Sequence, residues 1–297
     1  PCAGSPVRDV RLVPTAELTD TGGAEPMSIA APTVLVTGAS SGIGQATARR
    51  FTEEGFRVFG TSRHRRPDER GVEMLELDVR SDASVERCIR QVLERTEHID
   101  VLVNNAGVMH EGFAEETPLA DAEAIFAVNI FGTARVTNAV LPGMRGRHDG
   151  RIINIGSLAA WVGEPGQGYY AASKAAVARY TEALRHEVWH CGIRVTLVEP
   201  TVFATNVLAA SSTAEATIGD YDGPREKARR TLHESLAEGG DPGEAADLIV
   251  EIARAHAPHP RYGVGPEAFW LPHVKSLLPG RVFDQLLRHG FDLPGRP

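Results

Sequence analysis

The chain has 297 residues, 42% of them hydrophobic, so it can bury a large core as one domain or at most two. Its net charge of -8 argues against nucleic acid or an anionic membrane surface as the main partner. No apolar run approaches the roughly 20 residues of a membrane span. Cys2, Cys88 and Cys191 lie far apart without metal-ligand spacing, which predicts no metal site and a reducing, cytoplasmic compartment without a disulfide framework.

Residues 1–31 are polar, contain several Pro and Gly residues and lack the apolar core of a signal peptide. Met27 stands just before the first predicted strand, so we expect translation to start there, with the preceding stretch an upstream or added extension. The alternative is a genuine flexible N-terminal arm. In both cases a single folded domain is expected over residues 32–297.

The first predicted strand, Thr33 to Val36, runs into the turn TGASSGIG at residues 37–44, and a helix follows. Glycines allow a tight turn and a close approach of a ligand to the backbone. The free N–H groups and positive dipole end of the new helix suit a diphosphate. The spacing is Gly-x3-Gly-x-Gly rather than the commoner Gly-x-Gly-x-x-Gly, but strand, glycine turn and helix in succession predict nucleotide binding.

The second predicted strand, residues 56–61, is followed by Ser62-Arg63-His64-Arg65-Arg66. An NAD site usually has an acidic residue at this place to bind the ribose 2′-hydroxyl, and this chain has none there. Guanidinium groups suit a 2′-phosphate instead, which favours NADP(H) over NAD(H), with Arg63 as the favoured contact. The alternative is a solvated basic loop.

Further strands are predicted at residues 73–77, 99–103, 152–155, 193–198 and 262–264. Helices are predicted at residues 82–95, in the long region that carries Asn129, and at residues 242–255. Strands and helices that alternate with short links predict an α/β fold with a doubly wound parallel sheet and helices on both faces. A last helical stretch, residues 269–287, is interrupted by Pro272 and Pro279 and exposes aromatic and Leu side chains for packing.

The stretch from Arg151 to Lys174 is predicted to carry the chemistry. Ser157 ends a strand, and Tyr170 and Lys174 stand four residues apart on one face of an Ala-rich helix. A nearby ammonium favours the phenolate, so we expect a lowered pKa for Tyr170 and proton exchange near neutral pH. Tyr and Lys also meet at this spacing by chance, but the chain has only 3 Lys against 28 Arg, and ligands bind at strand ends such as that of Ser157.

Residues 202–240 are small and polar, with no strong apolar period. Because they follow a strand end, we predict a substrate lid that is loose when the site is empty and ordered when it is filled. The alternative is a passive, disordered surface insertion.

These motifs resemble the short-chain dehydrogenase/reductase family over about residues 32–200. They are TGASSGIG, Asp78-Val79, NNAG at residues 104–107, Asn129, Ser157 and YAASK at residues 170–174. The resemblance implies a Rossmann-like sheet of seven strands and hydride transfer between a nicotinamide cofactor and an alcohol or carbonyl. The tail, residues 261–287, is similar to the subgroup that includes 17β-hydroxysteroid and retinol dehydrogenases, which implies an apolar substrate.

The resemblance also implies roles for single residues. Ser157 would polarise the substrate oxygen, and Tyr170 would be the general acid/base. Lys174 would bind the nicotinamide ribose and depress the pKa of Tyr170, and Asn129 would anchor a water that links Lys174 to bulk solvent. The cofactor site is expected to comprise Gly38, Ser40, Ser41, Gly42, Ile43, Gly44, Arg63, Asp78, Val79, Asn105, Ala106, Gly107, Tyr170, Lys174, Pro200, Val202, Phe203 and Thr205.

One departure from the family pattern is visible. The family often has Pro-Gly after the sixth strand, whereas this chain has Pro200-Thr201, a side chain expected to narrow the nicotinamide end. The sequence as a whole predicts an NADP(H)-dependent oxidoreductase of a small, apolar carbonyl or alcohol, assembled as a homodimer or homotetramer. Two alternatives stay open. A non-catalytic dinucleotide sensor has no need of the proton donor, and a sugar-nucleotide epimerase shares Tyr-x-x-x-Lys but is disfavoured by the glycine spacing.

Overall fold

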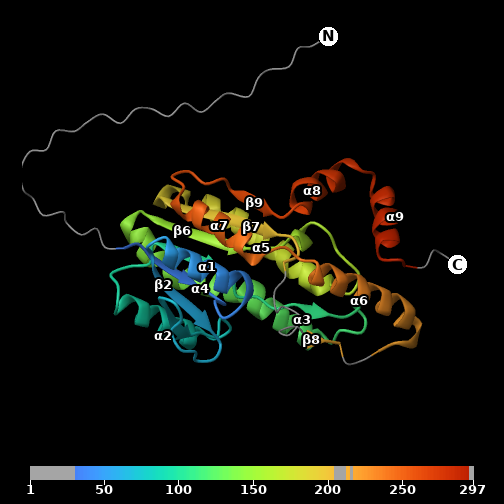
Figure 1. Cartoon of the computed structure of the whole chain (residues 1–297), viewed down its shortest axis with the longest axis horizontal. Coiled ribbons are helices and arrows are strands. Elements are labelled where there is room, and N and C mark those ends of the chain that lie inside the picture. The colour runs from blue at the N-terminus through green and yellow to red at the C-terminus, as the bar shows by residue number, and fades with distance from the viewer. Residues whose placement is uncertain (1–30, 204–211, 215–216, 294–297) are drawn as a thin grey trace, which may run out of the picture. The chain divides into compact units, whose positions relative to one another are not determined.

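The structure is a computed structural model that describes residues 31–203, 212–214 and 217–293 (Figure 1). The predicted N-terminal extension, residues 1–31, lies outside the described residues except for Ala31.

A parallel sheet of seven strands forms the centre of the domain, in the order β3-β2-β1-β4-β6-β7-β9. The predicted doubly wound α/β fold is therefore confirmed, with strand ends that differ from the predicted ones by one or two residues. The strands are β1 (Thr33–Val36), β2 (Arg57–Ser62), β3 (Val72–Glu76), β4 (Val101–Asn104), β6 (Gly150–Ile155), β7 (Ile193–Pro200) and β9 (Arg261–Val264).

Helices cover both faces of this sheet. On one face lie α2 (Asp82–Leu93), α4 (Thr133–Arg147) and α5 (Gly168–Glu187), and on the other lie α1 (Gly42–Glu53) and α7 (Pro242–Arg254). Strand β1 shows why both faces are covered, because successive side chains point to opposite faces of the sheet. Leu35 belongs to the apolar core below α2, α4 and α5, whereas Val34 and Val36 belong to the core below α1 and α7. The strand order reverses between β1 and β4, and ligands of such sheets bind at this switch point, beyond the carboxyl ends of the strands.

The predicted long helix around Asn129 is not regular. It consists of α3 (Leu119–Phe126), a π-helical turn η1 (Ala127–Gly132) that contains Asn129, and α4. The run Leu119–Arg147 is long enough, and with a mean hydropathy of 1.4 apolar enough, to cross a membrane by length and composition alone. Its contacts with α2, α5, β4 and β6 give its apolar side chains a place inside the fold.

The predicted lid is more ordered than its sequence suggests. Within residues 217–240 the chain forms a 3-10 turn, η5 (Gly219–Tyr221), and the helix α6 (Asp222–Ala237), which buries Ala228 and Leu232. Although the segment has no strong apolar period, α6 therefore buries two of its side chains against the fold. The apolar contact that α6 makes is small, and ion pairs supplement it. The helix can therefore pack without a long apolar period in its sequence.

Two short strands complete this region. Strands β5 (His110–Glu111) and β8 (Ser212–Thr213) pair in parallel, so the loop after β4 is linked to the chain that leads into α6. Elsewhere in the chain a 3-10 turn, η3 (Trp189–Cys191), joins α5 to β7.

The chain ends in two helices, α8 (Glu267–Leu277) and α9 (Gly280–Gly290), which follow β9 (Figure 1). The break expected at Pro279 is present, whereas Pro272 lies inside α8. Neither helix contains a buried residue, and Phe269, Trp270 and Leu277 are exposed, as predicted for this stretch.

Candidate active site

The glycine turn is held against the end of β4 by a small network of hydrogen bonds. The Thr37 hydroxyl donates to Val103 O (3.3 Å) and accepts from the backbone N–H groups of Asn105 (2.9 Å) and Ala106 (3.0 Å). The Asn105 amide in turn donates to Thr37 O (3.0 Å) and Gly38 O (3.1 Å). Asn105, predicted to line the cofactor site, thus serves that site by fixing the shape of the turn.

The turn leaves its inner surface open to a ligand. Gly38 (φ 66°) and Gly42 (φ 54°) take backbone conformations that favour glycine. A Cβ on Gly44 would overlap Gly38 O and the Asn105 amide, so only glycine fits there. Ser41 begins α1 without a side-chain hydrogen bond to the helix, and no acidic residue follows in the first turn. The free N–H groups of α1 and its positive dipole end therefore fit the diphosphate of a dinucleotide.

The end of β2 presents free positive charge. Arg63, Arg65 and Arg66 are exposed, and none of them forms an ion pair within the described part of the chain. At the neighbouring end of β3, Asp78 accepts from Arg80 Nε (3.0 Å) and Arg80 Nη2 (2.7 Å). These hydrogen bonds, together with the charges of Arg80 and Arg63, lower the pKa of Asp78. Its carboxylate is thus already neutralised by Arg80, while Val79 next to it is buried.

The three predicted catalytic side chains converge at the ends of β6 and α5. Ser157 begins the short turn η2 (Leu158–Ala160), and its hydroxyl accepts from Ala159 N (3.1 Å) and is hydrogen-bonded to the Tyr170 phenol. The Lys174 ammonium donates to Ile155 O (3.0 Å) and lies 5.9 Å from the centre of the Tyr170 ring. Lys174 is buried, whereas Ser157 and Tyr170 are half-buried at the edge of the site.

The electrostatics of Tyr170 differ from the prediction. Burial raises the pKa of Tyr170, the hydrogen bond from Ser157 opposes this rise, and the charge of Glu164 adds to it. Burial outweighs the expected lowering by Lys174, and burial also lowers the pKa of Lys174 itself, to about 8. Tyr170 is therefore protonated at neutral pH, which is the form that donates a proton.

Asn129 is tied to the backbone beside this site. Its amide donates to Val108 O (3.0 Å) and Ser173 Oγ (2.9 Å), and its carbonyl oxygen accepts from Val108 N (2.9 Å). A Cβ on Gly107 would lie 3.4 Å from Asn129 Oδ1 and 3.6 Å from Lys174 Nζ. Gly107, which is exposed, therefore lies against both the Asn129 amide and the Lys174 ammonium.

Comparison with known proteins agrees with this geometry. Residues 32–216 match the family model for short chain dehydrogenases. The chain belongs to the short-chain dehydrogenase/reductase family. It is 36% identical to a 3-ketodihydrosphingosine reductase of Bacteroides thetaiotaomicron, over 86% of this chain and 96% of that protein.

Two further relatives support the assignment. An NADP-dependent 3-hydroxy acid dehydrogenase of Salmonella typhi is 41% identical over 56% of this chain and 71% of its own length. A short-chain dehydrogenase structure from Streptomyces avermitilis has a TM-score of 0.74 and 33% identity, and covers 89% of this chain and 99% of that one. As a family member, the protein is an oxidoreductase that acts on CH–OH or C=O groups with a nicotinamide dinucleotide.

The departure from the family pattern after β7 lies beside β9. A Cβ on Gly265 (φ 95°) would overlap the Thr201 hydroxyl, so the Thr201 side chain lies against the chain just after β9.

The remaining predicted contacts after β7 have different surroundings. Pro200 is buried as the last residue of β7, and Val202 is 37% exposed. Phe203 is 4% exposed within the core and packs on Gly240, so it anchors this segment from inside. Thr205 lies outside the described residues.

Three acidic residues near the site were missed in the sequence. Glu164 lies in the loop between Ser157 and Tyr170, and its position between two catalytic residues was the signal that could have revealed it. Glu116 accepts from Ile218 N (2.8 Å) and pairs with Arg225 of α6. Glu111 pairs with two further residues of α6, Arg229 (3.3 Å) and His233 (3.0 Å), so carboxylates hold this helix over the site.

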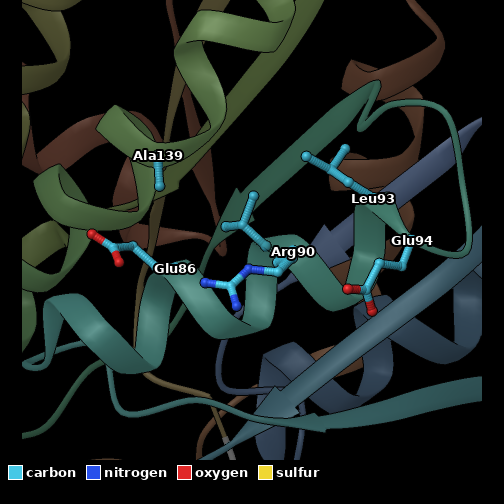
Figure 2. A pocket seen from close by; sticks show the side chains of 6 residues that line it. Glu86, Arg90, Leu93, Glu94 and Ala139 are labelled. Atoms are coloured by element: carbon cyan, nitrogen blue, oxygen red, sulfur yellow. The ribbon is translucent and has the colours of Figure 1, made fainter.

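Two hollows lie on the surface, and neither is lined by a residue of the predicted site. A cavity of about 130 Å³ lies below α6, with an apolar part that includes Phe113, Pro165, Ala228 and Leu232 and a polar part that includes Glu111, Arg225 and Arg229. A shallow groove between α2 and α4 is lined by Glu86, Arg90, Leu93, Glu94 and Ala139, as Figure 2 shows, together with Ile89. The cavity below α6 is also lined by Pro165 and Gly166, which belong to the loop between Ser157 and Tyr170.

Gly44→Ala is expected to weaken dinucleotide binding at least about tenfold, because the new methyl group must displace the Asn105 amide and Gly38 O. Fluorescence titration with NADPH measures this effect. Gly146→Ala in α4 is the matched control, since a Cβ there has nothing within 4 Å, and its affinity should equal that of the wild type.

Lys174→Met tests the cost of the buried ammonium. The folded-state pKa of about 8 lies below the unfolded value of 10.5, so burial destabilises the fold below pH 8, and this cost fades as the pH rises to 10.5. As the pH rises from neutral to alkaline, the wild type should therefore gain up to about 3 kcal/mol of unfolding free energy. The variant has no ammonium and should not show this gain. Urea unfolding across this range measures the difference. Lys275→Met, which removes an exposed ammonium, should show a much smaller change.

Proposed function

We propose that this enzyme is an NADP(H)-dependent reductase of ketones, which also oxidises the corresponding secondary alcohols. The observation that carries the proposal is the convergence of Ser157, Tyr170 and Lys174 beside an open glycine cradle. A complete set of proton-donating groups opposes the alternative of a non-catalytic sensor, which has no use for a buried Lys that costs stability.

The residues divide the reaction between them. When bound, the nicotinamide dinucleotide supplies the hydride for the carbonyl carbon, or accepts it in the reverse direction. Ser157 hydrogen-bonds the substrate oxygen, and Tyr170 donates its phenolic proton to that oxygen as negative charge develops there. The product is the alcohol, and Tyr170 is left as the phenolate beside the Lys174 ammonium.

The proton must then be replaced from solvent. Lys174 stabilises the phenolate by its charge, and the exposed Gly107 lies against both Lys174 and Asn129. We assign to Asn129 the role of fixing this segment through its three hydrogen bonds to Val108 and Ser173, so that a water beside Gly107 can reach Lys174.

The basic loop after β2 supports NADP(H) as the cofactor. Arg63 follows the end of β2 and forms no ion pair within the described residues, and Arg80 pairs with Asp78, two residues beyond the end of β3. A 2′-phosphate at Arg63 would therefore meet an unpaired guanidinium group, while the Asp78 carboxylate is already paired. The relative from Salmonella typhi is likewise named as NADP-dependent.

The described part of residues 202–240 supports a substrate lid. Helix α6 buries only Ala228 and Leu232 and is otherwise held by ion pairs to Glu111 and Glu116, so little apolar surface becomes exposed when the helix moves. Closure over a bound substrate would exclude water from the reacting carbonyl.

Tyr170→Phe should lower kcat by about 10²-fold or more, because it removes the general acid while keeping the ring. Steady-state turnover of NADPH with a panel of ketones measures this. Tyr169→Phe is the matched control, since Tyr169 has no Lys one turn further along the helix. Equal losses in the two variants would show that Tyr170 is not the proton donor.

Arg63→Asp should reduce the affinity for NADPH by about tenfold or more and favour NADH, because a phosphate partner is replaced by a like charge. Kinetics with both cofactors test this expectation. The same change at Arg281 of α9, which is exposed, should leave the cofactor preference as it is. A wild-type enzyme that prefers NADH by tenfold contradicts the assignment.

Hydrogen exchange tests the lid. Amides of α6 should gain protection when NADP(H) and a ketone that is turned over are both present, because closure removes them from solvent. If protection increases only around residues 38–44, the segment is a passive surface insertion.

A further inference from the structure

The side chain of Glu199 packs against the chain just before Ser157. Glu199 is the last residue but one of β7, and it is 3% exposed. A Cβ on Gly156, which precedes Ser157, would lie 3.3 Å from Glu199 Cγ. Gly156 N also donates to Val198 O (2.8 Å), so this part of the chain is held against β7 where it leads into Ser157.

The carboxylate of Glu199 holds the other end of the turn that Ser157 begins. Trp161 directly follows η2, and its indole Nε1 donates to Glu199 Oε2 (3.0 Å). At the start of η2 the Ser157 hydroxyl accepts from Ala159 N (3.1 Å), and the Ser157 backbone oxygen accepts from Ala160 N (3.0 Å). Glu199 therefore contacts the chain both before and after Ser157, and η2 connects the two contacts.

Two cations hold Trp161 in this position. Arg261 of β9 forms an ion pair with Glu199 (Nε to Oε2, 3.3 Å), and its guanidinium group lies 4.7 Å from the centre of the Trp161 ring. Lys275 of α8 donates to the backbone oxygen of Trp161. The indole is thus held at its N–H group, at its ring face and through its backbone, so it has little freedom to turn away from Glu199.

Stability alone does not explain a carboxyl group at this place. Glu199 Oε1 is buried and has no hydrogen-bond partner within the described residues, which costs free energy that an apolar side chain would not. Burial raises the pKa of Glu199, and the hydrogen bond from Trp161 and the charges of Arg261 and Arg179 oppose this rise. The contact with the indole does not depend on the outcome, because Oε2 can accept a hydrogen bond in either protonation state.

We propose that Glu199 is a positioning residue, which acts through the Trp161 indole to direct the Ser157 hydroxyl toward the substrate oxygen. This inference rests on the proposed function, because it assumes that Ser157 hydrogen-bonds that oxygen. The same hydroxyl is hydrogen-bonded to the Tyr170 phenol, so a shift of η2 would disturb both contacts at once. Since hydrogen bonds weaken steeply when misaligned, loss of the Glu199–Trp161 contact should lower kcat more than it weakens binding.

Three variants test the contact in steady-state turnover of a ketone with NADPH. Trp161→Phe removes the indole N–H and keeps a ring, and Glu199→Leu removes the acceptor. Each should lower kcat about tenfold, with KM for the ketone and the affinity for NADPH changed less than about twofold. Glu199→Gln should restore most of kcat, because its amide oxygen can still accept from the indole. Trp189→Phe is the matched control and should keep the wild-type kcat, because Trp189 is 60% exposed and its indole N–H forms no hydrogen bond within the residues that the structure describes.

A double-mutant cycle asks whether the effect passes through Ser157. Ser157→Ala should lower kcat about 10²-fold, and adding Trp161→Phe to it should cause no further loss, because the hydroxyl that the indole directs is gone. A general structural role would instead lower kcat about tenfold in both backgrounds. That result, or a wild-type kcat in Trp161→Phe, would overturn the inference.

Hydrogen exchange read by NMR separates this inference from the proposed reaction, because it needs no turnover. The amides of Ala159 and Ala160 should exchange at least about tenfold faster in Glu199→Leu than in the wild type, while those of η3 keep their rates. Faster exchange together with a wild-type kcat in Ser157→Ala would support the positioning contact and overturn the proposed role of Ser157. Unchanged exchange together with a large loss of kcat in Ser157→Ala would support that role and overturn the positioning contact.

Discussion

The hydrogen bond from the buried Lys174 ammonium to the Ile155 carbonyl joins the two halves of the catalytic site. It fastens α5 to the end of β6, and Ser157 follows that strand end by two residues. Tyr170, one helical turn before Lys174, is thereby placed where the Ser157 hydroxyl can reach its phenol. Without this contact the strand and helix would still pack, but their polar groups would have no fixed relation to one another.

Burying the Lys174 ammonium lowers the stability of the fold, and its proposed part in proton transfer explains why it is kept. An ammonium among apolar side chains has a lowered pKa, because burial disfavours its charged form. Burial likewise raises the pKa of Tyr170, so at neutral pH the site holds a protonated phenol next to an ammonium that loses its proton more readily than a solvated one. Such a site is ready to donate a proton, and its charge balance is completed by what binds.

Ion pairs also hold α6, the proposed substrate lid. Helix α6 is joined to the body of the domain chiefly through Glu111 and Glu116, and apolar burial is limited to two side chains. Both carboxylates are buried, and attraction between opposite charges is stronger where water is excluded. A substrate that fills the cavity below α6 therefore favours the closed helix, which couples binding to the exclusion of water from the reaction.

Much of the fold and the centre of the candidate site follow from local sequence. Alternating strands and helices predicted the parallel sheet, and the glycine turn and the Tyr-x-x-x-Lys pair predicted where cofactor and proton donor lie, because these features depend on residues close in the chain. The ordered helix α6 could not be predicted from the sequence, because its partners, Glu111 and Glu116, are about a hundred residues away in the chain.

Tertiary structure alone decided the environment of each group. Thr201 turns toward Gly265, Phe203 lies in the core, and the Tyr170 pKa rises rather than falls. The sequence by itself determined which chemical groups are present and on which elements they stand, because periodicity and turn chemistry are local. Only the packed structure determined their burial and their charge partners, because pKa values and side-chain directions depend on neighbours that the chain brings together from distant positions.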